Sequence, residues 1–132
     1  MKDDASDALG LWTTVAPYST FPCETISWRL LPALHHGQYR VYRRDGIAFG
    51  FASWGFMTHQ EFLTRDYDGR EVFAREDGDV LVVVDMIAPH GQNDVLCICR
   101  DLRRYFKAQY PNVESVLAHR FSRDGIFPNK GG

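Results

Sequence analysis

The apolar run VLVVVDMIA at residues 80–88 constrains the fold of this chain more than any other stretch. Its β-branched residues predict a central strand, and residues 93–110 carry apolar side chains at the i, i+3, i+4 and i+7 spacing of an amphipathic helix. Residues 113–122 then predict a last strand. A strand–helix–strand unit crosses over right-handed and makes its strands parallel neighbours. Where such neighbours part, we expect a slot beside the helix N-terminus that suits an extended thioester ligand.

A β-hairpin is predicted upstream, at residues 38–57. Two runs rich in aromatic and β-branched residues flank Asp45-Gly46, a dipeptide typical of tight hairpin turns. Strict alternation along the second strand divides its residues between two faces, with Ile47, Phe49 and Phe51 on one and Ala48, Gly50 and Ala52 on the other. We expect the small-residue face to admit another backbone, a helix or a ligand at close range.

The remaining segments predict helices around this sheet. Residues 5–16, 23–37 and 58–67 indicate three helical segments, the second of them ending near Pro32 and Gly37. Residues 66–79 are acidic and polar, which predicts a loop with one edge strand. The expected fold class is therefore α+β, or mixed α/β, with a mostly antiparallel central sheet flanked by helices.

Length and composition bound the class of protein. A chain of 132 residues predicts one domain, spanning residues 1–132. A formal net charge of −2 argues against a nucleic-acid-binding protein, because such domains carry strong positive charge. The cysteines Cys23, Cys97 and Cys99 are interpreted as reduced, mostly buried thiols of a cytoplasmic protein. The acidic N-terminus and the lack of a long apolar run predict no signal peptide and no integral membrane association.

Asp85 is the unusual residue of the apolar run. A buried carboxylate is costly unless it is paired or hydrogen-bonded, so this residue needs a partner. One interpretation is a structural carboxylate at a strand bulge, held by backbone amides or by an arginine. The other is an acid, a base or an orienting group at a strand end that faces a cleft. The run by itself leaves both interpretations open.

The helix after this run carries two further patterns. The turn APHGQND at residues 88–94 leads into the helix, and its amides either begin an ordinary helix or hold a phosphate such as that of phosphopantetheine. A basic stripe on one helix face is either a solvated surface or a docking patch for an acidic partner such as acyl carrier protein; it comprises Arg100, Arg103, Arg104 and Lys107. The histidines and cysteines lack metal-site spacing, so no metal site is expected.

Four short stretches stand out: LLPAL (30–34), GQY (37–39), ASW (52–54) and DMIAPHGQND (85–94). In their residues, order and spacing they resemble the RTX toxin-activating lysine acyltransferases, the hemolysin and cyclolysin activators. The resemblance runs from about residue 9 to residue 121. This resemblance implies a GNAT-like acyltransferase fold. It also implies transfer of a fatty acyl group from acyl carrier protein to the ε-amine of an internal lysine of a protein. The family's catalytic aspartate falls on Asp85, and its catalytic histidine falls on Tyr18.

The resemblance also implies roles for individual residues. We expect Asp85 to act as base or orienting group and Tyr18 as donor to the carbonyl oxygen or the leaving thiolate; in the alternative, His90 or His36 reaches the site from another direction. The residues expected to bind the acyl donor are Ser53, Trp54, Ile87, Ala88, Gly91, Asn93, Arg103 and Arg104. No tightly bound cofactor is expected; the co-substrate is acyl-ACP, which is a phosphopantetheine thioester, or acyl-CoA.

The leading hypothesis is a cytoplasmic N-acyltransferase. It moves a fatty acyl group from acyl carrier protein to a lysine or ornithine side-chain amine of a protein or a precursor peptide, as in lipopeptide maturation. Two alternatives stay open: a non-catalytic acyl- or peptide-binding module of the same fold, and an acetyl-CoA-dependent GNAT enzyme that acts on a small amine. The sequence leaves the acyl chain length and the oligomeric state open, with a homodimer among the alternatives.

Overall fold

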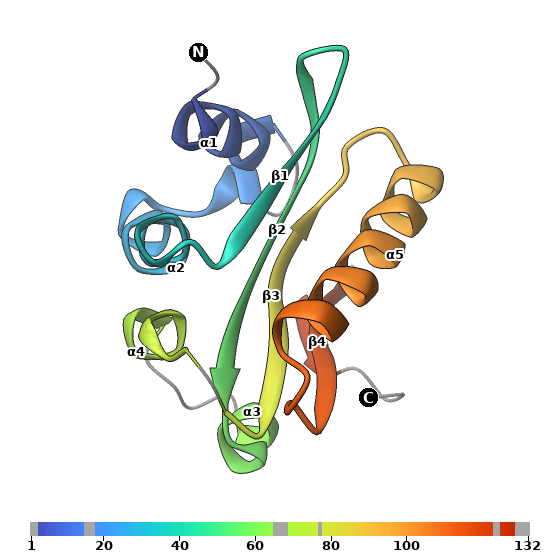
Figure 1. Ribbon diagram of the computed structural model, residues 1–132. Coiled ribbons are helices and arrows are strands. Elements are labelled where there is room, and N and C mark those ends of the chain that lie inside the picture. Colours follow the sequence, from blue (N-terminus) through green and yellow to red (C-terminus); the bar gives the residue numbers. More distant parts are fainter. Residues whose placement is uncertain (1–2, 15–17, 65–68, 77, 123–124, 129–132) are drawn as a thin grey trace.

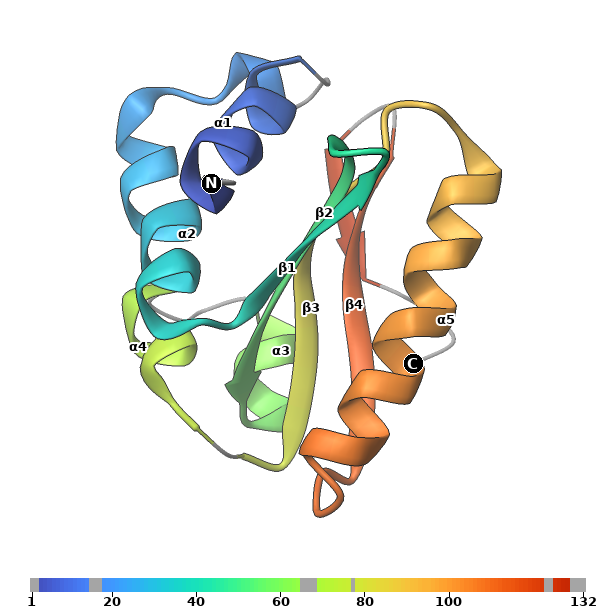
Figure 2. The ribbon, with the colours of Figure 1, turned by 45° about the horizontal axis from the view of Figure 1, so that its top comes forward.

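Helices cover both faces of a twisted β-sheet in the computed structural model, which describes residues 3–14, 18–64, 69–76, 78–122 and 125–128. Helices α1, α2 and α4 lie on one side of the sheet, and α5 lies on the other (Figures 1 and 2). The elements follow in the order α1 (Asp4–Thr14), η1 (Tyr18–Thr20), α2 (Cys23–His36), β1 (Tyr39–Arg44), β2 (Ile47–Met57), α3 (His59–Thr64), α4 (Gly69–Ala74), β3 (Val80–Ile87), α5 (Gln92–Gln109), β4 (Ser115–Ser122) and β5 (Gly125–Pro128).

The strands lie in chain order, β1-β2-β3-β4-β5. All neighbours are antiparallel except β3 and β4, which are parallel and are joined by α5. The predicted hairpin, the central strand and the strand–helix–strand unit are therefore confirmed. So is the α+β class with a mostly antiparallel sheet, and the arrangement agrees with the GNAT-like fold that the resemblance implies.

Strands β3 and β4 part after four paired residues. Their ladder runs from Val80 opposite Ser115 to Val83 opposite Ala118. On its other side, β3 stays paired with β2 as far as Ile87, which lies opposite Phe51. Within the described residues, the second half of β3 therefore has a strand neighbour on one edge and an open edge on the other.

A β-bulge lies next to this open edge. Ser53 pairs with Asp85 and Trp54 pairs with Val83, so Val84 is an extra residue in β3. Val84 packs with Ala33 of α2, and Asp85 also contacts α2, whereas Met86 packs against the cluster that contains α5 residues. Two consecutive residues thus face α2. Simple alternation would have turned the second of them toward α5.

A second bulge corrects the predicted faces of β2. Tyr42 pairs with Gly50 and Arg43 with Ala48, which leaves Phe49 as the extra residue. Phe49 therefore packs on the α5 side, and Phe51 on the α1 side, although alternation had placed both on one face. The expected close approach is confirmed at Gly50, where an added Cβ would lie 2.5 Å from the Cδ1 atom of Ile98 on α5.

One predicted helix end is confirmed, and two other sequence predictions are wrong. Helix α2 continues through Pro32 to His36 and ends, as expected, near Gly37, which adopts a left-handed conformation with φ of 71°. The segment 66–79 contains helix α4 where a loop with one edge strand was expected. The short strand β5 lies beyond residue 122, for which no element was predicted. The cysteines are free but exposed, and were expected to be mostly buried.

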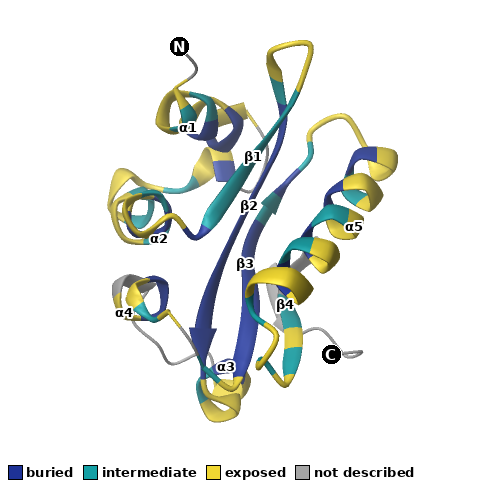
Figure 3. Cartoon of the chain, viewed as in Figure 1, coloured by how far each residue is buried: buried dark blue, intermediate teal, exposed yellow. Residues whose placement is uncertain are grey.

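The sheet forms the centre of the hydrophobic core. Almost the whole of β2 and β3 is buried, as the dark blue strands of Figure 3 show. One side of the sheet packs on α5 through Ile98, Leu102 and Phe106. The other side packs on the helices α1, α2 and α4. A side chain on β3 can therefore face either layer, and the bulge decides which layer Asp85 faces.

Candidate active site

Asp85 lies in a closed cluster beneath the N-terminal helices. Its residue exposure is 1%, and its side chain has three polar partners from three different elements. The Arg29 guanidinium of α2 contacts Oδ1, the Ser53 hydroxyl of β2 donates to Oδ2 at 3.4 Å, and the Tyr18 hydroxyl of η1 also hydrogen-bonds the carboxylate. A buried carboxylate with these partners meets the requirement that the sequence raised.

Tyr18 links the carboxylate to the backbone at the open edge of β3. Its hydroxyl accepts a hydrogen bond from the Met86 N–H at 3.4 Å. Its ring packs edge-on against Trp12 at 4.8 Å and Phe21 at 5.5 Å between ring centroids. Burial, and secondly the negative charge of Asp85, raise the pKa of the Tyr18 hydroxyl far above its ordinary range. The hydroxyl therefore stays neutral and keeps its proton for donation.

Arg29 is the site residue that the sequence analysis missed. Its guanidinium carbon lies 5.3 Å from the Phe21 ring centroid and 5.9 Å from that of Trp12, while its Nη2 contacts Asp85. A signal was available, because Arg29 is a cation within the largely apolar stretch ISWRLL and a buried carboxylate needs a cation. Sequence spacing alone does not connect the two residues.

Burial raises the pKa of the Asp85 carboxyl. The Arg29 guanidinium and the hydrogen bonds from Arg29, Ser53 and Tyr18 act in the opposite direction, because they stabilise the ionised form. Desolvation is the largest of these effects, so the Asp85 carboxyl binds its proton more tightly than in water, while one cation and three hydrogen-bonding side chains stabilise its charged form.

An apolar groove of about 730 Å³ lies on the opposite face of the sheet, between α5 and strands β3 and β4. Its wall residues come from β3 (Val83, Met86), from α5 and the following turn (Cys99, Leu102, Arg103, Phe106, Lys107, Tyr110, Pro111, Val113) and from β4 (Val116, Leu117, Ala118). Met86 lines the groove, whereas the neighbouring Asp85 faces α2. The β3 backbone therefore separates the groove from the carboxylate cluster.

The other predicted site residues lie around these two features. Ser53, Trp54 and Ile87 are buried, with exposures of 1%, 0% and 1%, and Trp54 donates from Nε1 to the Tyr110 hydroxyl at 3.3 Å. Ala88 is half-buried, and His90, Gly91 and Asn93 are exposed in the connection to α5 and its first turn. Of these seven described residues, Ser53 contacts the Asp85 carboxylate and none lines the groove, so their roles stay predictions.

The basic stripe of α5 lies partly at the groove. Arg103 and Lys107 line it, while Arg104 is exposed beside them on the same helix. The N-terminus of α5 is farther away, because the groove begins at Cys99 and the helix begins at Gln92. Gly91, with φ of 116°, makes no side-chain cap. The groove thus lies along the second half of the helix, and the slot expected beside the helix N-terminus stays a prediction.

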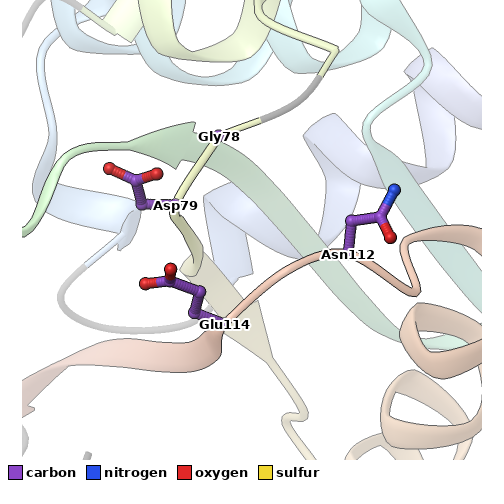
Figure 4. Close-up of a pocket in the computed structure, with 4 residues that line it drawn as sticks. All are labelled: Gly78, Asp79, Asn112 and Glu114. Carbon is purple, nitrogen blue, oxygen red and sulfur yellow. The ribbon is translucent and has the colours of Figure 1, made fainter.

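A polar hollow of about 350 Å³ occupies the far end of β3. Gly78, Asp79, Asn112 and Glu114 line it, and Figure 4 shows the two carboxylates on the segments that lead into β3 and β4. Asp79 comes just before β3 and Asp85 near its other end, so the hollow does not belong to the Asp85 cluster. The described part of the chain contains no group of three His, Cys, Asp or Glu side chains placed to hold a metal ion.

Known proteins resemble this chain over most of its length. A model of the RTX toxin acyltransferase family matches residues 3–125. The leukotoxin-activating lysine-acyltransferase of Aggregatibacter actinomycetemcomitans is 26% identical over 117 residues, which cover 87% of this chain and 67% of that protein. The protein-lysine myristoyltransferase of Escherichia coli is 26% identical over 112 residues, covering 83% of this chain and 60% of that protein.

An uncharacterized protein of Synechocystis is 32% identical over 113 residues, covering 82% of this chain and 72% of that protein. Across the curated relatives, the matched region spans between 53% and 72% of the relative's own length. As for membranes, none of the described helices is both long and apolar enough to span a bilayer.

Proposed function

Because this chain belongs to the RTX toxin acyltransferase family, we propose that it transfers a fatty acyl group from a thioester donor to the side-chain amine of a lysine, or of ornithine, in a protein or precursor peptide. The observation that carries this proposal is the family match over residues 3–125, which includes both the Asp85 cluster and the α5 groove. The acceptor class follows the relatives, of which one is named a lysine-acyltransferase and another a protein-lysine myristoyltransferase.

We assign the acyl chain to the α5 groove. Its volume of about 730 Å³ falls in the range of ligand pockets, roughly 300–1,000 Å³. Its walls are mostly apolar, which suits a fatty chain, and Arg103 and Lys107 add positive charge. An acidic carrier protein is the donor that such cations favour, so acyl carrier protein is proposed as donor and acyl-CoA as its smaller substitute.

The chemistry joins the amine nitrogen to the acyl carbon and breaks the carbon–sulfur bond. A lysine has a pKa near 10.4 in water, so its ammonium must first lose a proton. We propose that Asp85 takes a proton from the attacking amine through the Tyr18 hydroxyl, since Tyr18 hydrogen-bonds the carboxylate and the carboxylate itself is buried. The first proton of the ammonium passes to solvent, and the proton taken by Asp85 returns through the Tyr18 hydroxyl to the departing thiolate, which leaves as the thiol.

The Met86 N–H is proposed to stabilise the carbonyl oxygen. It points to Tyr18 at the open edge of β3, and Met86 also lines the groove. A backbone donor fixed by a strand is suited to a developing oxyanion because it needs no reorganisation during the reaction. The Asp85 cluster and the groove come from one chain, so the reaction is compatible with a monomer and with a homodimer. We place it in the cytoplasm, where free thiols such as the three cysteines persist.

The direct test uses carrier protein loaded with a fatty acyl group and lysine-containing peptides, read by intact mass. We expect the peptide to gain the acyl mass and the carrier protein to lose it. Ornithine peptides, acyl-CoA and acetyl-CoA with small amines form parallel arms. Tight binding of the acyl donor without transfer to any amine would favour a non-catalytic binding module and would overturn the proposal. Transfer from acetyl-CoA to small amines alone would indicate the acetyltransferase alternative.

A further inference from the structure

Arg29 is the member of the Asp85 cluster with the most access to solvent. Its side chain is 20% exposed, whereas the Asp85 side chain is 0% exposed. The other two members are almost as deeply buried as Asp85, with residue exposures of 6% for Tyr18 and 1% for Ser53. Arg29 is therefore the residue that connects the buried carboxylate to the protein surface.

The guanidinium is held from two directions. One edge contacts the carboxylate, and its carbon lies within 5.3–5.9 Å of the ring centroids of Phe21 and Trp12. An arginine over aromatic rings is stabilised by the ring quadrupole, and it stays weakly hydrated. The contacts with Phe21 and Trp12 thus hold the guanidinium beside the Asp85 carboxylate.

No second cation serves the carboxylate among the residues that the structure describes. The groups that face Asp85 are Arg29 from α2, the neutral hydroxyl of Tyr18 from η1 and the hydroxyl of Ser53 from β2. Helix α1 contributes the uncharged ring of Trp12, which packs on Tyr18. The charge balance at Asp85 therefore rests on one guanidinium.

We propose that Arg29 is a positioning residue for acyl transfer. Its guanidinium keeps the Asp85 carboxylate ionised and aligned, so that the carboxylate acts as a base through the Tyr18 hydroxyl at the open edge of β3. This inference rests on the proposed function, because it gives Asp85 the role of base. It assigns no contact with substrate to Arg29. Lysine would restore the charge without the flat shape that fits between a carboxylate and two rings.

The kinetic test compares Arg29→Gln and Arg29→Lys with the wild type in the acyl-carrier-protein assay. We expect Arg29→Gln to lower kcat by at least about tenfold at pH 7, with little change in KM for the donor, as for loss of an interaction that serves only the chemical step. Without the cation the carboxylate binds its proton more tightly, so the acid limb of the rate profile should move to higher pH. Arg29→Lys should recover part of both effects.

Arg43→Gln is the matched control. Arg43 lies on β1 and pairs with two carboxylates of α1, Asp4 at 2.7 Å and Asp7 at 2.8 Å. This variant therefore also breaks ion pairs between an arginine and carboxylates, but away from Asp85. It should leave kcat and the rate profile unchanged. An Arg29→Gln variant that folds and keeps the wild-type kcat and pH profile would overturn the inference. Thermal unfolding checks folding, and Arg29→Lys takes the place of Arg29→Gln if the latter does not fold.

A second readout does not depend on catalysis. Carboxyl ¹³C NMR follows the titration of Asp85 directly, and its midpoint should be higher in the Arg29 variant than in the wild type, with Arg43→Gln unchanged. An unchanged midpoint in the Arg29 variant contradicts the inference even if transfer is observed. If the wild type transfers no acyl group while the midpoint still moves, the proposed function fails and Arg29 is reduced to a structural partner of Asp85.

Discussion

The Asp85 carboxylate on β3 contacts the Arg29 guanidinium on α2, across 56 positions of sequence. The contact exists because the bulge at Val84 turns Asp85 toward α2 and away from the α5 groove. Asp85 and Met86 then serve opposite faces of the same strand, with the carboxylate cluster on one side and the groove on the other.

Asp85→Asn should remove the proposed base while keeping the size of the side chain. Loss of a general base lowers a rate by roughly 10²–10⁴-fold, so acyl transfer measured by mass spectrometry should fall by about that factor. The thermal unfolding midpoint should fall as well, because Arg29 loses its carboxylate partner. A variant that folds and transfers at the wild-type rate would show that Asp85 has only a structural role.

Ala118→Phe should shorten the acyl chain that the groove accepts. Ala118 lies in the groove wall where the β3–β4 ladder ends, so a larger side chain there reduces the space in the groove for the acyl chain. Transfer of long acyl groups should fall several-fold relative to short ones when both are offered in competition. Ala108→Phe, on the exposed side of α5 and outside the groove wall, is the control and should keep the wild-type preference.

Charge reversal of Arg103 and Arg104 should weaken the use of acyl carrier protein more than the use of acyl-CoA. Both residues are exposed on α5 and Arg103 lines the groove. Rim charges act mainly on association, so kcat/KM with the carrier protein should fall by about tenfold and become less sensitive to salt. Equal losses with both donors would place the effect in the groove and argue against a docking patch.

Gly50→Ala should destabilise the fold through one identifiable contact. The new Cβ would lie 2.5 Å from Ile98 Cδ1 and 3.3 Å from the Ile87 carbonyl oxygen, and such overpacking costs about 1–3 kcal/mol. Ile98→Val removes that Cδ1 atom, so the double variant should lose less free energy of unfolding than the sum of the two single changes. Gly10→Ala is the contrasting control.

At Gly10, in the middle of α1, an added Cβ meets nothing within 4 Å. Alanine there should therefore stabilise the protein by about 0.5–1 kcal/mol through its better helix propensity. Chemical denaturation measures all four variants. Strict additivity of Gly50→Ala and Ile98→Val would contradict the packing explanation.

Glu61 should make the fold sensitive to acid. Arg75 donates to both of its carboxylate oxygens, at 2.7 and 3.0 Å, and the Thr58 N–H donates at 2.9 Å to cap α3. These contacts, those of Arg75 first, lower the pKa of Glu61 from 4.5 to about 2. The stabilisation is present above about pH 4.5 and is lost as pH falls toward 2.

Glu61→Gln removes this ionisation. The free energy of unfolding should therefore fall less steeply between pH 4.5 and 2 in the variant than in the wild type. Denaturant titrations at several pH values measure the two slopes. Parallel pH curves for the two proteins would show that Glu61 titrates alike in the folded and unfolded chains.

Sequence patterns predicted the helices and strands better than they predicted which side of the sheet each side chain faces. The Asp45-Gly46 turn and the periodicity of the long helix are set by near neighbours, so both were found. The faces of Phe49 and Asp85 were not, because Phe49 is the extra residue of one bulge and Asp85 follows the extra residue of another, and each bulge depends on register with another strand. Helix α4 was also missed, and it rests on tertiary contacts such as the close approach of Val72 to Gly55.

The sequence by itself determined that this chain has a strand–helix–strand unit, a hairpin and one carboxylate in an apolar strand, because local spacing and hydrophobicity carry that information. It also carried the family motifs that point to acyl transfer. Only the tertiary structure decided that Arg29 is the partner of Asp85 and that the groove lies on the other face of β3. The physical reason is that desolvation selects the partner of a buried charge after the chain has folded, from residues that are distant in sequence.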